Sequence, residues 1–190
     1  MTVLPKISAQ EETIRFTASL FSYSGLVAQI VLLQQFSTYK IAHAEFILPI
    51  FLSVAFLCGY SGIRWEILSG KNKLLRIYQG FLINALGLLF LVLASHDVYN
   101  GLLFFSGVII SGLGSGVVCI ATMNRNKNKP SSSCLYKFIL LSAGTVLSVA
   151  VCLIVRANFT VMTGFPYAFS LLFDLSLLGA IYVKITEHDY

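Results

Sequence analysis

The stretch that decides the fold is "GLLFFSGVIISGLGSGVVCIATM", residues Gly101–Met123. It contains no charged residue, and its length exceeds the roughly 20 residues that a helix needs to cross about 30 Å of hydrocarbon. A transmembrane β-strand would instead alternate apolar and polar residues over about ten positions. Because backbone groups in lipid must be hydrogen-bonded within their own segment, we predict a transmembrane helix here.

Similar apolar runs fill most of the remaining chain. The 190 residues are 57% hydrophobic and only 11% charged, whereas soluble domains are usually about 25% charged. We therefore predict an all-α integral membrane protein that forms a single transmembrane domain over residues 1–190, with six helices. The other predicted spans are about Phe16–Phe36, Ala42–Gly62, Arg76–Ser95, Phe138–Val155 and Val161–Val183.

The distribution of Lys and Arg predicts the orientation. If both termini are cytoplasmic, only Lys40 and Arg156 fall outside, and the loops are short enough for the positive-inside rule to apply. We expect a multi-pass protein of the bacterial inner membrane.

The basic inner segments are expected to contact anionic lipid or an acidic cytosolic partner. Direct binding of nucleic acid is disfavoured, because the aromatic residues that interleave with cations in single-strand binders are missing. The basic residues concerned are Arg64, Lys71, Lys73, Arg76, Arg125, Lys127, Lys129 and Lys137.

One carboxylate interrupts the last predicted span, in "SLLFDLSLLG", Ser170–Gly179. Charge inside a bilayer is costly, so such a residue usually faces the helix bundle and finds polar partners. We expect Asp174 to do so, and four polar residues are predicted at a similar depth. Either Asp174 binds a proton or cation or couples a sensor, or it is a structural carboxylate that fixes helix packing. The residues at similar depth are Tyr23, Asn84, Ser115 and Thr145.

Small residues recur at intervals of four in the fourth and fifth predicted spans. Gly107, Ser111 and Ser115 form one such series, and Gly112 and Gly116 form another. Small side chains at this spacing allow close helix contact, either within one subunit or between subunits. Gly144 and Ser148 repeat the pattern in the fifth span.

No set of residues predicts an enzyme. We find no nucleophile–base pair, no metal-binding cluster and no cofactor fingerprint, so we expect a protein without catalysis and without a cofactor. His43, His96 and His188 all lie near the predicted span boundaries.

The layout is similar to that of the membrane subunit of the Kiwa anti-phage defence system, a short multi-span chain that is basic inside and works with a separate cytosolic DNA-binding partner. The resemblance implies a homo-oligomeric membrane sensor or anchor that recruits a cytosolic effector.

An alternative is a small transporter or half-transporter that uses Asp174 for proton or cation coupling, near helix bends at Pro49 and Pro166. The segment "GIRWEILSGKNKLL", Gly62–Leu75, resembles the loop after the second helix of major facilitator transporters, which also contains Gly, an acid and basic residues.

Overall fold

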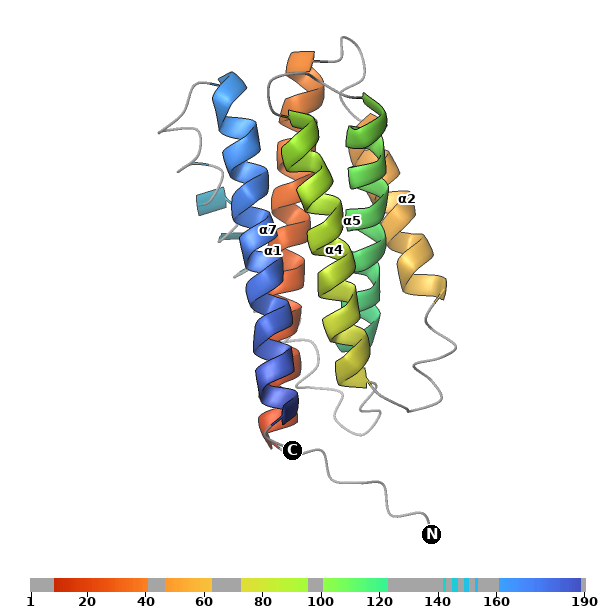
Figure 1. The fold of residues 1–190 in the computed structure, drawn as a ribbon, viewed down its shortest axis with the longest axis vertical. Helices are drawn as coiled ribbons and strands as arrows, with labels where there is room; N and C mark the ends of the chain where they lie inside the picture. The colour runs from red at the N-terminus through yellow and green to blue at the C-terminus, as the bar shows by residue number, and fades with distance from the viewer. Residues whose placement is uncertain are drawn as a thin grey trace.

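A computed structural model describes residues 9–40, 47–62, 73–95, 101–122 and 161–188, together with Ser142, Thr145, Val146, Val149, Ala150 and Leu153. The ranges form five α-helices (Figure 1). They are α1 (Ala9–Lys40), α2 (Ile47–Gly62), α4 (Lys73–Ser95), α5 (Gly101–Thr122) and α7 (Val161–His188). All except α2 are long and apolar enough to cross a membrane, so the all-helical, membrane-type character predicted from the sequence is confirmed.

The helix bounds differ from the predicted spans mainly at the polar ends. α1 and α7 extend beyond their apolar runs, because a helix continues into water while its backbone bonds remain intact. α2 has 16 residues, which span about 24 Å, and residues 42–46 of the predicted span lie outside the described part. The predicted span at 138–155 also lies outside it, except for the separate positions named above, which are helical and exposed.

Two apolar clusters establish the directions of α1, α4, α5 and α7. The first includes Phe36, Leu91, Phe104 and Phe169. These residues come from the end of α1, the end of α4 and the beginnings of α5 and α7, which meet at the upper end of the bundle in Figure 1.

The second cluster contains the opposite ends of the same helices, and it lies at the lower end of Figure 1. Ile14, Ile77, Val118 and Val183 represent α1, α4, α5 and α7 in it. Consequently α5 and α7 run in the same direction, antiparallel to α1 and α4. The chain between Thr122 and Val161 therefore connects the lower end to the upper end.

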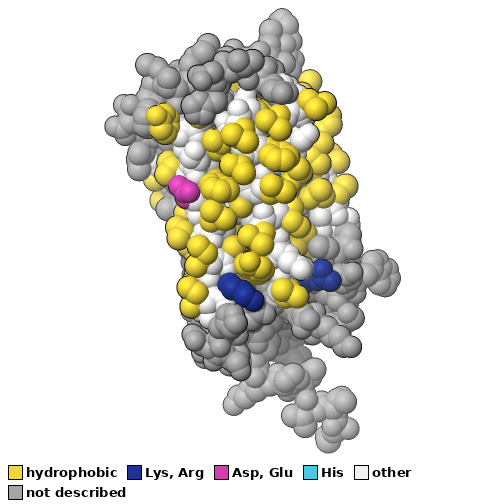
Figure 2. All heavy atoms as spheres, in the orientation of Figure 1, with side chains coloured by type: hydrophobic (Ala, Val, Ile, Leu, Met, Phe, Trp, Pro, Cys, Tyr) yellow, Lys and Arg dark blue, Asp and Glu magenta, His cyan; other side chains and the backbone are white. Residues whose placement is uncertain are grey.

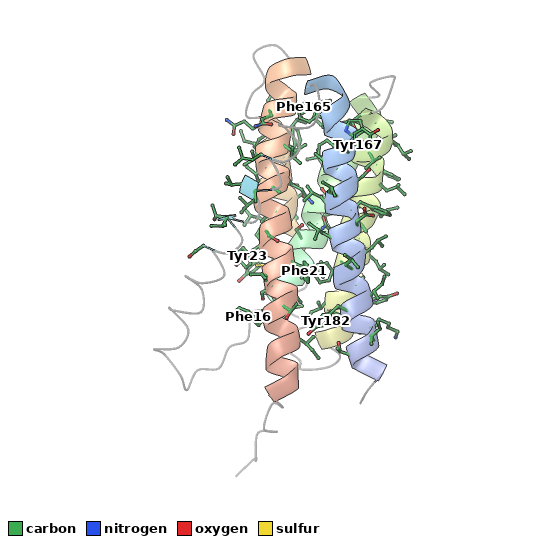
Figure 3. The ribbon with its side chains drawn as sticks, turned by 90° about the vertical axis from the view of Figure 1, so that its left-hand side faces the viewer. Phe16, Phe21, Tyr23, Phe165, Tyr167 and Tyr182 are labelled. Atoms are coloured by element: carbon green, nitrogen blue, oxygen red, sulfur yellow. The ribbon has the colours of Figure 1, made fainter. Side chains whose placement is uncertain are left out.

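Aromatic side chains join three helices at the upper end. The rings of Phe36 and Phe104 are stacked with centroids 4.3 Å apart, and Phe165 meets Phe36 edge-on at 5.1 Å. Phe169 meets Phe104 edge-on at 6.0 Å. Both geometries are favoured by the ring quadrupoles, so α1, α5 and α7 are held together there. Figure 3 shows Phe165 and Tyr167 at the upper end of α7 and Tyr182 toward its lower end.

Glycines bring α5 into backbone contact with α4. A Cβ atom added to Gly107 would lie 2.8 Å from the carbonyl oxygen of Gly87, and one added to Gly114 would overlap the backbone of Asn84. Such distances leave no room for a side chain, so the two helices lie as close as their backbones allow.

A second glycine face of the same helix contacts α2. A Cβ atom at Gly112 would lie 2.8 Å from the carbonyl oxygen of Leu52, and one at Gly116 would overlap the carbonyl of Phe56. The later glycine of α5 contacts the later residue of α2, so the two helices run in the same direction. These small-residue faces therefore make contacts within a single chain.

We predict that Gly114→Ala destabilises the bundle by about 1–3 kcal/mol, because the added methyl meets backbone atoms that cannot move aside. The measurement is the thermal unfolding midpoint of the purified protein in detergent. Gly25→Ala is the matched control in α1, because a Cβ added there meets nothing within 4 Å apart from its own stretch of helix. Equal midpoints for the two variants would contradict the close approach of α4 and α5.

Candidate functional site

A buried network of hydrogen bonds around Asn84 connects four helices. Gln29 Nε2 and Ser115 Oγ both donate to Asn84 Oδ1, at 3.2 and 3.3 Å. Asn84 Nδ2 donates to Ser176 Oγ at 3.2 Å, and that hydroxyl donates to the carbonyl oxygen of Phe81 at 2.9 Å. The network thus connects α1, α4, α5 and α7.

The network forms a polar layer in the otherwise apolar interior. Each of its four side chains is at most 7% exposed. A polar group in such surroundings is costly unless it is hydrogen-bonded, so the layer favours one relative arrangement of the helices. Gln29 Oε1 is the exception, because it is buried and has no hydrogen-bond partner among the described residues.

Close packing at glycine places the network. Gly114 lies against the backbone of Asn84, which brings Ser115, the next residue of α5, within reach of the Asn84 amide. On the other side, Gly179 lies against the ring of Phe81, with a Cβ position 2.8 Å from the ring edge. α7 therefore approaches α4 closely enough for Ser176 to bond the Phe81 carbonyl.

Tyr23 and Cys119 form a separate polar contact between α1 and α5. The thiol of Cys119 lies 3.4 Å from the hydroxyl oxygen of Tyr23, and the tyrosine is only partly buried. Of the polar residues predicted at the depth of Asp174, the structure brings Asn84 and Ser115 together. Tyr23 contacts Cys119 instead. Thr145 is exposed and therefore lies outside the buried network.

Asp174 does not face the interior as the sequence predicted, because the structure places it on the outer surface of α7. Exposed neighbours Leu171 and Leu178 lie one turn before and one turn after it. Ser176 is two residues further along, about 200° around a helix of 3.6 residues per turn, and it is buried. The predicted depth gave no information about which side of the helix carried the charge.

Two basic side chains that the structure describes, Arg76 and Lys184, lie toward the lower end of the bundle. Arg76 Nη1 donates to Gln79 Oε1 at 3.1 Å on α4. Lys184 Nζ lies 5.7 Å from the centroid of the Tyr78 ring, which joins α7 to α4 by a cation–π contact. The side chain of Lys73, at the start of α4, is not described.

Several predicted site residues fall outside the described part of the chain. They are Arg64, Lys71, Arg125, Lys127, Lys129, Lys137, Gly144 and Ser148.

Sequence reasoning missed Gln29 and Ser176. Both are polar residues within apolar runs, and that was the available signal. The network as a whole offers neutral donors and acceptors, which suit hydrogen bonding between helices or to a small polar molecule. Within the described ranges, no three His, Cys, Asp or Glu residues come together as metal ligands.

No protein-family model matches the chain, and the searches of curated proteins and of solved structures also give no match.

We predict that Asn84→Leu destabilises the protein by about 1–3 kcal/mol, because Gln29 and Ser115 then lose their acceptor in a buried site. Ser53→Ala is the control, since Ser53 is exposed and bonds only its own helix, at the carbonyl of Pro49. The measurement is the free energy of unfolding in mixed micelles.

The double variant Gln29→Leu/Asn84→Leu should lose less than the sum of the single losses, because both partners of one bond are removed together. Strict additivity would contradict the coupling of α1 and α4 through this bond.

Proposed function

We propose that the protein is a non-enzymatic membrane anchor or sensor that recruits a cytosolic effector through its basic inner segments. The observation that supports this most directly is the neutral interior. Among the described residues, the buried polar side chains are only Ser, Thr, Asn and Gln. Such an interior fixes helix packing without presenting a charged group for catalysis or ion coupling, so function is left to the surfaces of the bundle.

The transporter hypothesis needs Asp174 inside the bundle, next to a path for the substrate. Because Asp174 is exposed on α7, it no longer supports the transporter hypothesis. We therefore prefer the anchor.

We propose six transmembrane passes with both ends cytoplasmic. α5 and α7 run in the same direction, so the chain between Thr122 and Val161 has to return once across the bundle. Residues 138–155 form the apolar run in this connection. With this one return pass the number of crossings is even. The beginning of α1 and the end of α7 lie at the same end of the bundle, as an even number requires (Figure 1).

The basic segments of the sequence follow helix ends that lie at this same end of the bundle. Arg64 and Lys71 follow the end of α2, and the basic residues 125–137 follow the end of α5. Both helix ends lie on the side of Arg76 and Lys184. Figure 2 shows the basic colour toward the lower end of a mostly apolar face, with acidic colour higher on the same face. This concentration of positive charge is suited to an acidic protein surface, and it agrees with the positive-inside rule.

The layout shared with the Kiwa membrane subunit supports anti-phage defence in a bacterial inner membrane as the setting for this proposal. Under it, the protein is a homo-oligomer whose effector is a separate cytosolic protein. Since the glycine faces of α5 are used within one chain, the oligomer would form through other surfaces.

Reporter fusions test the topology. Green fluorescent protein fused after residue 128 of a shortened chain, or after residue 190 of the whole chain, should fluoresce, because both junctions are cytoplasmic. A chain truncated after residue 158 and fused to alkaline phosphatase should be active, because that junction is outside. With both reporters fused in turn at residues 128 and 158, the same reporter active at both junctions would contradict the return pass.

Native mass tests recruitment. The protein, extracted gently from host cells together with the products of its neighbouring genes, should have a mass equal to a multiple of 20.9 kDa plus a cytosolic protein. Replacing Arg125, Lys127 and Lys129 by Gln should release the cytosolic protein. Lys40→Gln/Arg156→Gln, on the predicted outer side, is the charge control and should have no effect. A bare monomer or homo-oligomer before any substitution would overturn the anchor proposal.

A further inference from the structure

One exposed stripe of α7 has the spacing of a helix-packing seam. Its residues recur at alternating intervals of four and three, and such a repeat keeps one face of a helix toward a partner helix. The large apolar members are 44–60% exposed, so the described helices leave much of their side-chain surface uncovered. The stripe consists of Tyr167, Leu171, Asp174, Leu178, Ile181 and Ile185.

Asp174 lies in the middle of this seam and near the middle of the membrane span. The apolar part of α7 runs from Gly164 to Thr186, so Asp174 is about 15 Å from one end and about 18 Å from the other. A carboxylate side chain is too short to reach water from that depth, and an unpaired charge facing hydrocarbon is strongly disfavoured. The side chain therefore needs a partner at its own depth.

The described residues supply no cation there. Arg76 contacts Gln79 near the beginning of α4, and Lys184 is ten residues further along α7, against Tyr78. The sequence also has no Lys, Arg or His between Arg156 and Lys184. A second copy packed on the same stripe would place one carboxylate opposite another and would supply no cation to either.

We propose that this stripe of α7 binds a transmembrane helix of another protein that carries a Lys or Arg near the middle of its span. The apolar residues of the stripe pack against that helix, and Asp174 pairs with its cation. Burying the two charges against each other removes both from hydrocarbon. This lateral partner is distinct from the cytosolic effector, because its contact lies about 15 Å away from the basic end of α7.

Fluorescent model helices in liposomes test the proposal. The full chain, carrying a donor dye, is reconstituted with an acceptor-labelled Leu/Ala helix that has one central Lys. The matched helix has Leu in place of that Lys, and a third helix carries the Lys one turn from its end. We expect energy transfer to the central-Lys helix with an apparent affinity about tenfold or more above that of the other two helices. Asp174→Asn should lower the affinity for the central-Lys helix to that of the other two helices.

The controls separate a folding defect from loss of the site. Asp174→Asn keeps the shape of the side chain, and its thermal midpoint should stay near that of the unchanged protein because position 174 is exposed. Leu102→Asn places the same amide on an exposed position of α5 and should leave binding intact. Equal binding of all three helices, or binding that survives Asp174→Asn, would overturn the proposal.

Two other occupants give different results. Strong energy transfer between two labelled copies of the protein, lost in Asp174→Asn, would assign the stripe to self-association instead. The second test places Cys residues at positions 174 and 145 in a background without the natural cysteines. A disulfide that forms efficiently between them within one chain would assign the stripe to the chain's own residues 138–155. Either result contradicts an outside partner.

Discussion

The backbone contacts of α5 with α4 and α2 are the interaction on which the rest of the structure depends. Gly107 and Gly114 face one neighbour while Gly112 and Gly116 face the other. Apolar side chains alone give helices little reason to associate in lipid, because lipid tails are equally apolar. Close approach gains van der Waals contacts over the length of the interface, and any larger residue at these positions would separate the helices.

The buried polar layer follows from that close approach. Asn84 reaches Ser115 because Gly114 leaves no space between α4 and α5, and it reaches Ser176 because Gly179 admits the ring of Phe81. The hydrogen bonds then favour one rotation and one register of the helices, which packing of Leu and Val side chains would specify less sharply. The layer is neutral, and the charged side chains that the structure describes lie outside the buried interior. Arg76 and Lys184 lie toward one end of the bundle, and Asp174 lies on its side.

Polar residues with the same depth have different roles here. Ser176 and Asp174 are two residues apart, yet the first is buried in the network and the second is exposed on the outer stripe. Under the proposed lateral contact, amides and hydroxyls specify the packing of the bundle and a carboxylate is left for a partner helix. This division between the two residues also explains why a carboxylate in a span is not by itself a sign of transport.

The sequence by itself determined the helical, membrane-type fold, because runs such as Gly101–Met123 are too long and too apolar for other structures. It also determined that small residues and polar residues would be concentrated in particular helices. Only the tertiary structure decided that the glycines of α5 contact α2 and α4 of the same chain, that Gln29 joins Asn84, and that Asp174 faces outward. Hydropathy and spacing record depth and periodicity, whereas the rotation of each helix depends on which neighbours it packs against.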